Sequence, residues 1–408
     1  MSKKKKIIGI ILLLVVTNVL TFIFSNVLSL TYDNKVILPK DEYNQLSDMY
    51  KKYSKNLALE DFIKKNYLKN VDEETLANGE LKGMFQSLND PYSTYMTKDE
   101  FEDFTEHTKG IYGGIGVIVT PGDDNLITVV SPIDGTPGEK AGIKTGDKIT
   151  KVNGKEFNAD TMDQAVKVMK GDPGTKVNIT IVRKDKEGNN KEMDITIVRE
   201  EIRLQTVSSD IIEGNIGYIN ITSFDDLTYK DFKKEINGLM DKNIKGIILD
   251  LRNNPGGLLD VCVDIADEFL DKGIVVYTQT RDGQKEYLRS DNDKIDLPLV
   301  VLVNKGSASA SEILAGAIKD RGRGTLVGTT TFGKGIVQRI KQLSDGSGFK
   351  LTVSQYFTPK GINIHGVGIK PNVEVELPEN VETIGVENLK NDTQLQKGLE
   401  ILKGKINQ

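Results

Sequence analysis

Segment 306–312 carries the first group of residues suited to chemistry at a carbonyl. It reads Gly-Ser-Ala-Ser-Ala-Ser-Glu and lies between an apolar run and a helical pattern. A serine at such a junction has an exposed hydroxyl beside the partial positive charge of a helix start. The backbone N–H of Ala310 can face the same point, which is half of an oxyanion hole. The ordinary alternative is that these serines only cap the helix.

Segment 331–338 carries the second group, Thr-Phe-Gly-Lys-Gly-Ile-Val-Gln, with a lysine between two glycines. Lys334 can act as a general base only when it is neutral. Lowering a lysine pKa from about 10.4 to about 7 takes roughly 4.6 kcal/mol, which burial can supply. If the segment is helical, Gln338 shares the face of Lys334 and can accept a hydrogen bond from its amine. The alternative is a surface lysine in a turn.

Segment 251–257 carries the third group, Leu-Arg-Asn-Asn-Pro-Gly-Gly, at the end of the apolar run Ile244–Leu251. Glycines at positions 256 and 257 allow a bare backbone N–H to point into a cleft. The alternative is an ordinary turn between a strand and a helix.

The elements around these segments predict a layered α/β domain over residues 214–375. Apolar runs typical of buried strands alternate with helical faces. The expected strands are Ile216–Ile221, Ile244–Leu251, Ile274–Thr278, Leu299–Val303, Leu326–Gly328 and Phe349–Val353. The expected helices are centred on 232–240, 258–270 and 310–317, and a short surface helix is expected at Asp392–Leu402.

Segment 108–198 predicts a separate, small β-rich module. Short β-branched stretches separated by glycine-rich turns predict strands at Val117–Thr120, Ile127–Val130, Lys148–Val152 and Lys176–Val182. One helix is expected at Thr161–Met169, with Asp160 as its N-cap and Gly171 just past its end.

The N-terminus reads as a membrane anchor. Lysines at 3–6 precede a 24-residue run, 7–30, that has no charged residue. Such a run spans ~36 Å as a helix, enough for a ~30 Å hydrocarbon core. The positive-inside rule then leaves the N-terminus in the cytoplasm and the rest of the chain outside. The alternative is a cleaved signal peptide.

Residues 32–107 are polar and read as helical. Their partly amphipathic pattern also allows pairing with a second copy of the chain, so a homodimer through this region is one expectation.

Composition excludes several classes of protein. The net charge of −5 and the lack of a basic stripe beyond the N-terminus argue against nucleic-acid binding. The single cysteine, Cys262, cannot form an internal disulfide and is expected to be a small core residue. One cysteine and two histidines, His107 and His365, leave little for a structural zinc site. A Ser-His-Asp triad would need one of these two histidines.

Taken together, the three segments resemble the carboxyl-terminal processing peptidases, or tail-specific proteases. The quoted residues are G-S-A-S-A-S-E-I (306–313), F-G-K-G-x-x-Q (332–338) and L-R-x-N-P-G-G (251–257). Segments 112–117 and 131–149 look like a bacterial PDZ domain, and Asp90-Pro91-Tyr92-Ser93 and Gly368-Ile369-Lys370-Pro371 add to the similarity. The family usually has Asp after Pro371, where this chain has Asn372.

The resemblance implies roles for these residues. Ser309 would be the nucleophile, Lys334 the general base and Gln338 the residue that orients the lysine. The oxyanion would be held by the N–H of Ala310 and by one from the glycine pair, for which we favour Gly257. Such a dyad needs no histidine, metal or cofactor, so His107 and His365 are expected to be structural.

The resemblance also implies a fold: a crotonase-like α/β serine peptidase core with an inserted PDZ domain. The expected division is an anchor at 1–31, a helical region at 32–107, the PDZ domain at 108–198, the peptidase domain at 199–380, and a C-terminal helix and tail at 381–408. The chain would then be a single-pass membrane protein with an extracytoplasmic catalytic domain.

A PDZ domain implies selection of substrates by their C-termini. An extended peptide adds a strand to the edge of the module, and its carboxylate sits among backbone N–H groups. The expected carboxylate site is Gly113, Gly114, Ile115 and Gly116, with Gly116–Val119 as the pairing edge. Apolar walls would favour an apolar last residue, and binding could gate the peptidase. The rivals are an inactive anchored PDZ adaptor and a crotonase-like acyl-CoA enzyme.

Overall fold

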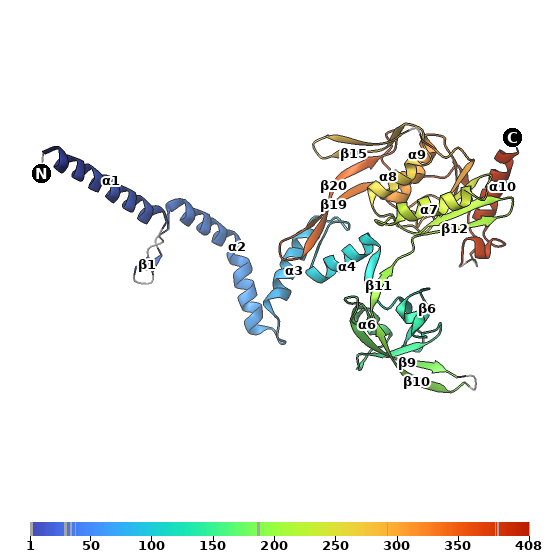
Figure 1. The fold of residues 1–408 in the computed structure, drawn as a ribbon, viewed down its shortest axis with the longest axis horizontal. Helices are drawn as coiled ribbons and strands as arrows, with labels where there is room; N and C mark the ends of the chain where they lie inside the picture. The colour runs from blue at the N-terminus through green and yellow to red at the C-terminus, as the bar shows by residue number, and fades with distance from the viewer. Residues whose placement is uncertain are drawn as a thin grey trace. The chain divides into compact units, whose positions relative to one another are not determined.

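The computed structural model describes residues 3–27, 31–32, 35–36, 38–185, 188–291, 293–379, 381 and 383–407. These residues form two compact units, Met1–Gly83 and Met84–Gln408. The helix α3 (Glu73–Gln86) contains the division between them. Each unit is described by itself below (Figure 1).

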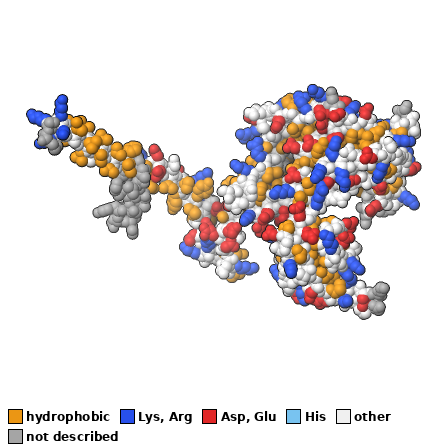
Figure 2. Space-filling view, viewed as in Figure 1, with side chains coloured by type: hydrophobic (Ala, Val, Ile, Leu, Met, Phe, Trp, Pro, Cys, Tyr) orange, Lys and Arg blue, Asp and Glu red, His pale blue; other side chains and the backbone are white. Residues whose placement is uncertain are grey.

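The first unit is made of long helices. The helix α1 (Lys3–Val27) is followed by a two-stranded antiparallel pair, β1 (Thr31–Tyr32) and β2 (Lys35–Val36), and by α2 (Lys40–Asn66). Figure 2 shows apolar side chains along α1 behind the lysines of its first turn. Its stretch Lys3–Ile23, with mean hydropathy 2.4, is long and apolar enough to cross a membrane, although a signal sequence has the same properties. The end of the predicted anchor, 28–30, lies outside the described residues.

The second unit is built around a six-stranded central sheet. Its strands are β12 (Val207–Ile212), β13 (Ile216–Ile221), β14 (Ile247–Asp250), β17 (Leu299–Val303), β18 (Thr325–Gly328) and β21 (Val373–Glu374), in that order. All neighbours pair in parallel except β12 with β13. Every residue of β14 and of β17 is buried, which is why the sequence shows continuous apolar runs there.

Helices cover both faces of the central sheet (Figure 1). The helices α7 (Thr228–Met240), α8 (Leu259–Asp267) and α9 (Ala310–Asp320) pack on the face that contains Leu249 and Val301. The C-terminal helix α10 (Thr393–Ile406) packs on the other face, against Ile248 and Val300. The surface helix expected at Asp392–Leu402 is therefore present and extends to Ile406, with one apolar face on the sheet and a polar face, including Gln396 and Glu400, in solvent.

A second sheet carries the segment of Lys334. Its path is β16 (Lys285–Ser290), β15 (Gly273–Thr280), β20 (Gly348–Phe357) and β19 (Ile336–Gln342), and β3 (Thr94–Met96) pairs with β20. Gln338 thus lies in a strand, and the helical alternative for 331–338 is wrong. Pairing with β20 supplies the backbone hydrogen bonds that a helix would have made locally.

The β-rich module is linked to the rest through one pair of strands. The strands β4 (Ile111–Gly114) and β11 (Glu200–Arg203) pair antiparallel, so the chain enters and leaves the module side by side. Between them lies a sheet of β10 (Asn190–Val198), β9 (Lys176–Lys184), β7 (Lys148–Val152), β6 (Ile127–Pro132) and β5 (Val117–Pro121), with β8 (Lys155–Glu156) paired to β7. The strand β5 is therefore an edge strand.

Three helices accompany this module. They are α4 (Lys98–Lys109) before it, and α5 (Pro137–Lys140) and α6 (Met162–Met169) within it. A 3₁₀ turn, η1 (Ala159–Thr161), leads into α6, and a second one, η2 (Val386–Asn388), precedes α10. The cap of η1 is Asn158, whose side chain accepts from the backbone N–H of Thr161. The predicted N-cap, Asp160, lies inside this turn instead, because the tighter turn starts the helical region two residues earlier.

Candidate active site

Ser309 sits at the junction between β17 and α9 in a strained backbone conformation. Its φ is 54° and its ψ is −114°, a region that residues with a side chain rarely adopt. The neighbouring serines have structural roles: the Oγ of Ser307 donates to the C=O of Leu251 at 2.8 Å, and the Oγ of Ser311 donates to the C=O of Asn254 at 3.0 Å. Both are completely buried, whereas Ser309 is half-buried. Ser309 is thus the serine of this segment that solvent can reach.

A buried carboxylate joins the segment of Ser309 to the segment of Lys334. Glu312 has no exposed surface, and its Oε2 accepts the backbone N–H groups of Ser309 and Lys334, each at 2.9 Å. Its Oε1 accepts from the Oγ1 of Thr331 at 2.6 Å and the N–H of Gly333 at 2.7 Å. The sequence reasoning missed this residue. The available signal was a glutamate three residues after a helix-start serine, the pattern of a capping box.

The hydroxyl of Tyr356 forms a second link between the same two segments. It lies 2.5 Å from the C=O of Lys334 and 3.1 Å from the C=O of Ser309. Tyr356 belongs to β20 and is almost completely buried. The backbones of Ser309 and Lys334 are therefore held from two sides.

The glycine turn packs directly against the candidate nucleophile. A Cβ on Gly256 would lie 2.8 Å from the Cβ of Ser309 and 2.9 Å from the backbone nitrogen of Ala310. The N–H of Gly256 donates to the Oδ1 of Asn254 at 2.8 Å. Phe224 forms an isolated parallel bridge with this turn. Its N–H donates to the C=O of Gly256 at 3.0 Å, and its C=O accepts the N–H of Leu258 at 2.8 Å, so the bridge does not use the N–H of Gly257. Of the pair, Gly257 is thus the one whose N–H is available to a ligand.

The side chain of Lys334 is half-buried and points at an aromatic ring. Its Nζ lies 4.9 Å from the centroid of Tyr92. Burial lowers its pKa, the charge of Lys350 lowers it further, and Asp90 and Glu312 oppose this shift. Within the described part of the chain, no hydrogen bond joins this amine to Ser309. Gln338 makes a long contact, 3.5 Å, from its Nε2 to the Oγ1 of Thr352. The structure thus brings the three segments together without joining the side chains of Ser309, Lys334 and Gln338.

A cavity of about 280 Å³ lies between the edge strand β5 and the helix α6. Its apolar walls include Ile115, Val117, Val166 and Met169. Among the residues expected to bind a carboxylate, Ile115 and Gly116 lie between β4 and β5, whereas Gly113 and Gly114 belong to β4 and pair with β11.

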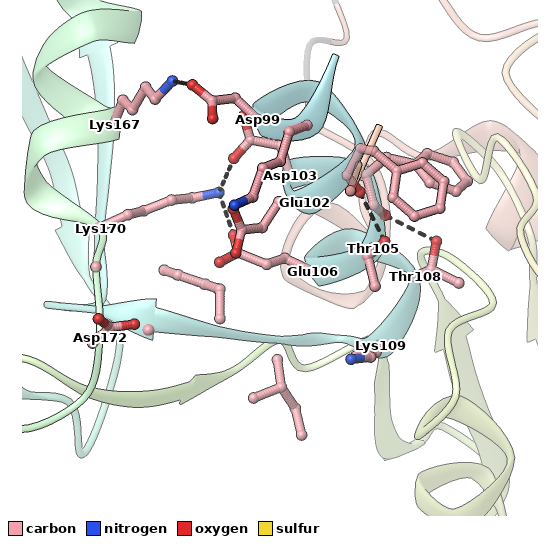
Figure 3. A pocket seen from close by; sticks show the side chains of 18 of the residues that line it. Asp99, Glu102, Asp103, Thr105, Glu106, Thr108, Lys109, Lys167, Lys170 and Asp172 are labelled. Carbon is pink, nitrogen blue, oxygen red and sulfur yellow. Dashed lines mark hydrogen bonds and ion pairs between the residues drawn. The ribbon is translucent and has the colours of Figure 1, made fainter. Parts of the chain in front are cut away.

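A larger cavity, of about 1040 Å³, separates the β-rich module from α4 (Figure 3). Its charged groups pair across it. Lys170 reaches Glu106 at 2.8 Å and Asp103 at 3.4 Å, and Lys167 pairs with Asp99. Lys170 and Glu106 also line the smaller cavity, so one ion pair borders both spaces.

Neither histidine pairs with Ser309 or Lys334 among the residues that the structure describes. His107 lines the smaller cavity, and His365 is exposed with its ring 6.4 Å from that of Tyr92. Cys262 is fully buried, as predicted for a core residue, and burial raises the pKa of its thiol. Among the described residues, no group of three His, Cys, Asp or Glu side chains is arranged to hold a metal ion. Asn372, at the position where the family has Asp, accepts the N–H of Leu326 with its Oδ1 at 2.9 Å.

Family models and a solved structure show the class of protein to which the chain is similar. A family model for peptidase family S41 matches residues 215–375, a PDZ domain model matches residues 128–183, and a model of the activating protease CtpB N-terminal domain matches residues 14–100. A solved structure, a putative S41 protease from Bacteroides fragilis, shares the fold at a TM-score of 0.53 and 17% identity, over 79% of this chain and 90% of that one. The fold is that of an S41 peptidase, and the chain also carries a PDZ domain.

Two curated relatives show which family of peptidases the chain belongs to. The chain is 39% identical to the carboxy-terminal processing protease CtpA of Bacillus subtilis, over 93% of this chain and 79% of that protein. It is 41% identical to a carboxy-terminal-processing protease of Bartonella bacilliformis, over 82% and 77% of the two chains. The chain belongs to the carboxy-terminal processing protease family, which supports the activity of a serine-type protease that acts at C-termini.

Proposed function

We propose that the chain cleaves proteins near their C-termini with Ser309 as nucleophile, Lys334 as general base and Gln338 as the residue that orients the lysine. The observation that carries this proposal is the carboxylate of Glu312, which binds the backbones of both Ser309 and Lys334. The lowered pKa of Lys334 also favours the neutral amine that a base requires.

The proposed reaction has two acyl-transfer steps. The neutral amine of Lys334 takes the proton of the Ser309 hydroxyl while the oxygen attacks the peptide carbonyl. The N–H groups of Ala310 and Gly257 donate to the developing oxyanion. Lys334 then protonates the leaving amine, and water hydrolyses the acyl-enzyme with Lys334 again as base.

The proposed substrates are extracytoplasmic or membrane-tethered proteins with accessible, apolar C-termini. A tail would pair with the free edge of β5 and place its last side chain between Val166 and Met169. The helix α1 would anchor the chain with its N-terminus in the cytoplasm, since lysines precede the apolar stretch. Exposed apolar residues of α2, such as Tyr50 and Phe62, would be covered by a second copy of the chain.

Tail binding is also proposed to gate the peptidase. The ion pair of Lys170 and Glu106 borders both the tail cavity and the contact with α4. A carboxylate in the tail cavity would compete with Glu106 for Lys170. The helix α4 packs on β20 through Phe101, and β20 pairs with β19, the strand that contains Gln338. A shift of α4 after the ion pair breaks would therefore move the sheet that positions Gln338.

Cleavage of a quenched fluorescent peptide that ends in two alanines tests the proposed chemistry. Ser309→Ala and Lys334→Ala should each abolish cleavage while the peptide still binds, and Lys305→Ala, an exposed lysine on the neighbouring turn, is the matched control. Full cleavage by Lys334→Ala would rule out the proposed base. A wild-type chain that binds the peptide and never cuts it would favour the adaptor alternative.

A further inference from the structure

The segment Asp90-Pro91-Tyr92-Ser93 has no role in the proposed reaction, yet it lies beside the proposed base. The ring centroid of Tyr92 is 4.9 Å from the Nζ of Lys334. Among the residues that the structure describes, this Nζ makes no hydrogen bond and no ion pair. The half-buried ring is thus the group that it faces.

The position of the Tyr92 ring is set by the turn that carries it. The carboxylate of Asp90 accepts the N–H of Tyr92 at 3.0 Å and the hydroxyl of Ser93 at 2.6 Å. The hydroxyl of Ser93 in turn accepts the N–H of Thr352 on β20 at 2.9 Å. The hydroxyl of Thr352 is the group that Gln338 contacts. The turn is therefore hydrogen-bonded to β20 next to Gln338, and these bonds hold the backbone of Tyr92 in place.

We propose that Tyr92 is a positioning residue that holds the charged form of Lys334 against its ring in the substrate-free enzyme and releases the neutral form toward Ser309. The physical basis is the ring quadrupole, which attracts an ammonium and has little attraction for an uncharged amine. Loss of the proton therefore removes the contact that keeps the amine away from the nucleophile. This inference rests on the proposed role of Lys334 as the base.

Other groups that can carry a charge near Lys334 come from several elements. Lys350 on β20 disfavours the ammonium, whereas Asp90 in the same turn and Glu312 on α9 favour it. His365 lies at the edge of the Tyr92 ring. All of these remain when only the ring is replaced, so a substitution at position 92 isolates the effect of the ring.

The test compares the pH dependence of kcat/KM for the wild type, Tyr92→Leu and Tyr92→Phe with the quenched peptide. This constant reports the ionisation of the free enzyme. Tyr92→Leu removes the ring and should shift the acid limb of the profile to lower pH by about half a unit to one unit. Tyr92→Phe keeps the ring and should keep the wild-type limb. A purely structural role would lower the rate at every pH without moving the limb.

A second measurement covers the case in which Tyr92→Leu folds poorly. In a Ser309→Ala background, the pH dependence of acylation of Lys334 by an amine-reactive reagent is followed by peptide mass spectrometry, and Tyr92→Phe and Tyr92→Trp are compared. This measurement does not need Tyr92→Leu: Tyr92→Phe should keep the wild-type midpoint, and Tyr92→Trp, whose ring attracts a cation most strongly, should raise it. A midpoint that falls in Tyr92→Trp would contradict the inference.

Two outcomes of the kcat/KM profiles would also overturn the inference: an unmoved limb in folded Tyr92→Leu, or an equal shift in Tyr92→Phe. Either would leave the proposed reaction intact as long as Lys334→Ala is inactive. Activity of Lys334→Ala would instead remove the proposed base itself, so the two failures are distinguishable.

Discussion

The guanidinium of Arg252 forms two hydrogen bonds with the carboxylate of Asp392, both at 2.8 Å, across 140 positions of the chain. Neither side chain is exposed. Arg252 also pairs with Asp250 at the end of β14, and Asp392 accepts the N–H of Leu395 in the first turn of α10. The C-terminal helix is therefore tied to the turn whose Gly256 packs against Ser309.

Asp392→Asn should destabilise the second unit strongly, because it leaves the buried guanidinium only partly compensated. Removing one partner of a buried pair costs about 3–5 kcal/mol. The free energy of unfolding in urea measures this loss. The matched control is Glu387→Gln, since Glu387 is exposed in the same C-terminal segment. An equal, small effect of both variants would show that the buried pair adds no stability.

The contribution of Asp392 should also depend on pH. Burial acts to raise the pKa of this carboxyl, but the hydrogen bonds and charge of Arg252 outweigh it and hold the pKa below its usual value. A depressed pKa in the folded state gives stability that is present above the unfolded value, about 3.9. That stability is lost as pH falls through the folded pKa. The difference between wild type and Asp392→Asn, measured from pH 7 to pH 3, should shrink only below about pH 4.

Lys350→Met should move the acid limb of kcat/KM to higher pH. Burial is the largest cause of the lowered pKa of Lys334, and the positive charge of Lys350 is the second. Without it the ammonium is favoured, so a smaller fraction of the enzyme holds the neutral base at a given pH. The control is Lys305→Met, and a shift of the same size in that variant would contradict an effect specific to position 350.

Glu312→Gln should lower kcat by about 100-fold, the loss expected for a displaced catalytic group. The carboxylate accepts four donors, whereas an amide would turn its NH₂ group toward two of them. The backbones of Ser309 and Lys334 would then separate. Unfolding in urea distinguishes a local effect from global destabilisation, and a folded variant with wild-type kcat would refute the positioning role.

Removal of residues 111–203 tests gating by the PDZ domain. The N–H of Leu204 donates to the C=O of Gly110 at 2.8 Å, so a short linker can join the two ends without distorting the remainder. We expect the rate of turnover to change by more than the loss of tail affinity explains. Turnover unchanged at saturating peptide would argue against gating.

Much of the second unit was predictable from local patterns. The strands Ile216–Ile221 and Leu299–Val303 have the predicted ends, because strands buried on both faces leave continuous apolar runs. The strand predicted at Ile244–Leu251 is too long, since the observed strand spans only Ile247–Asp250. Ile244 and Leu251 are apolar because they join the core beyond the ends of the ladder.

The family, the residue types of the site and the alternation of strands and helices could be predicted from the amino-acid sequence, because these depend on neighbours along the chain. The amino-acid sequence left open which serine solvent can reach, whether Gln338 lies in a helix and what Glu312, Tyr92 and Asp392 contact. These points follow from the packing of the folded chain. The bonds of Ser307 and Ser311 and the ion pair of Arg252 join segments that are distant in the chain, and no local pattern encodes such partners. The strands β19 and β20 are neighbours in the chain, but their pairing depends on the sheet that β20 forms with β15 and β3.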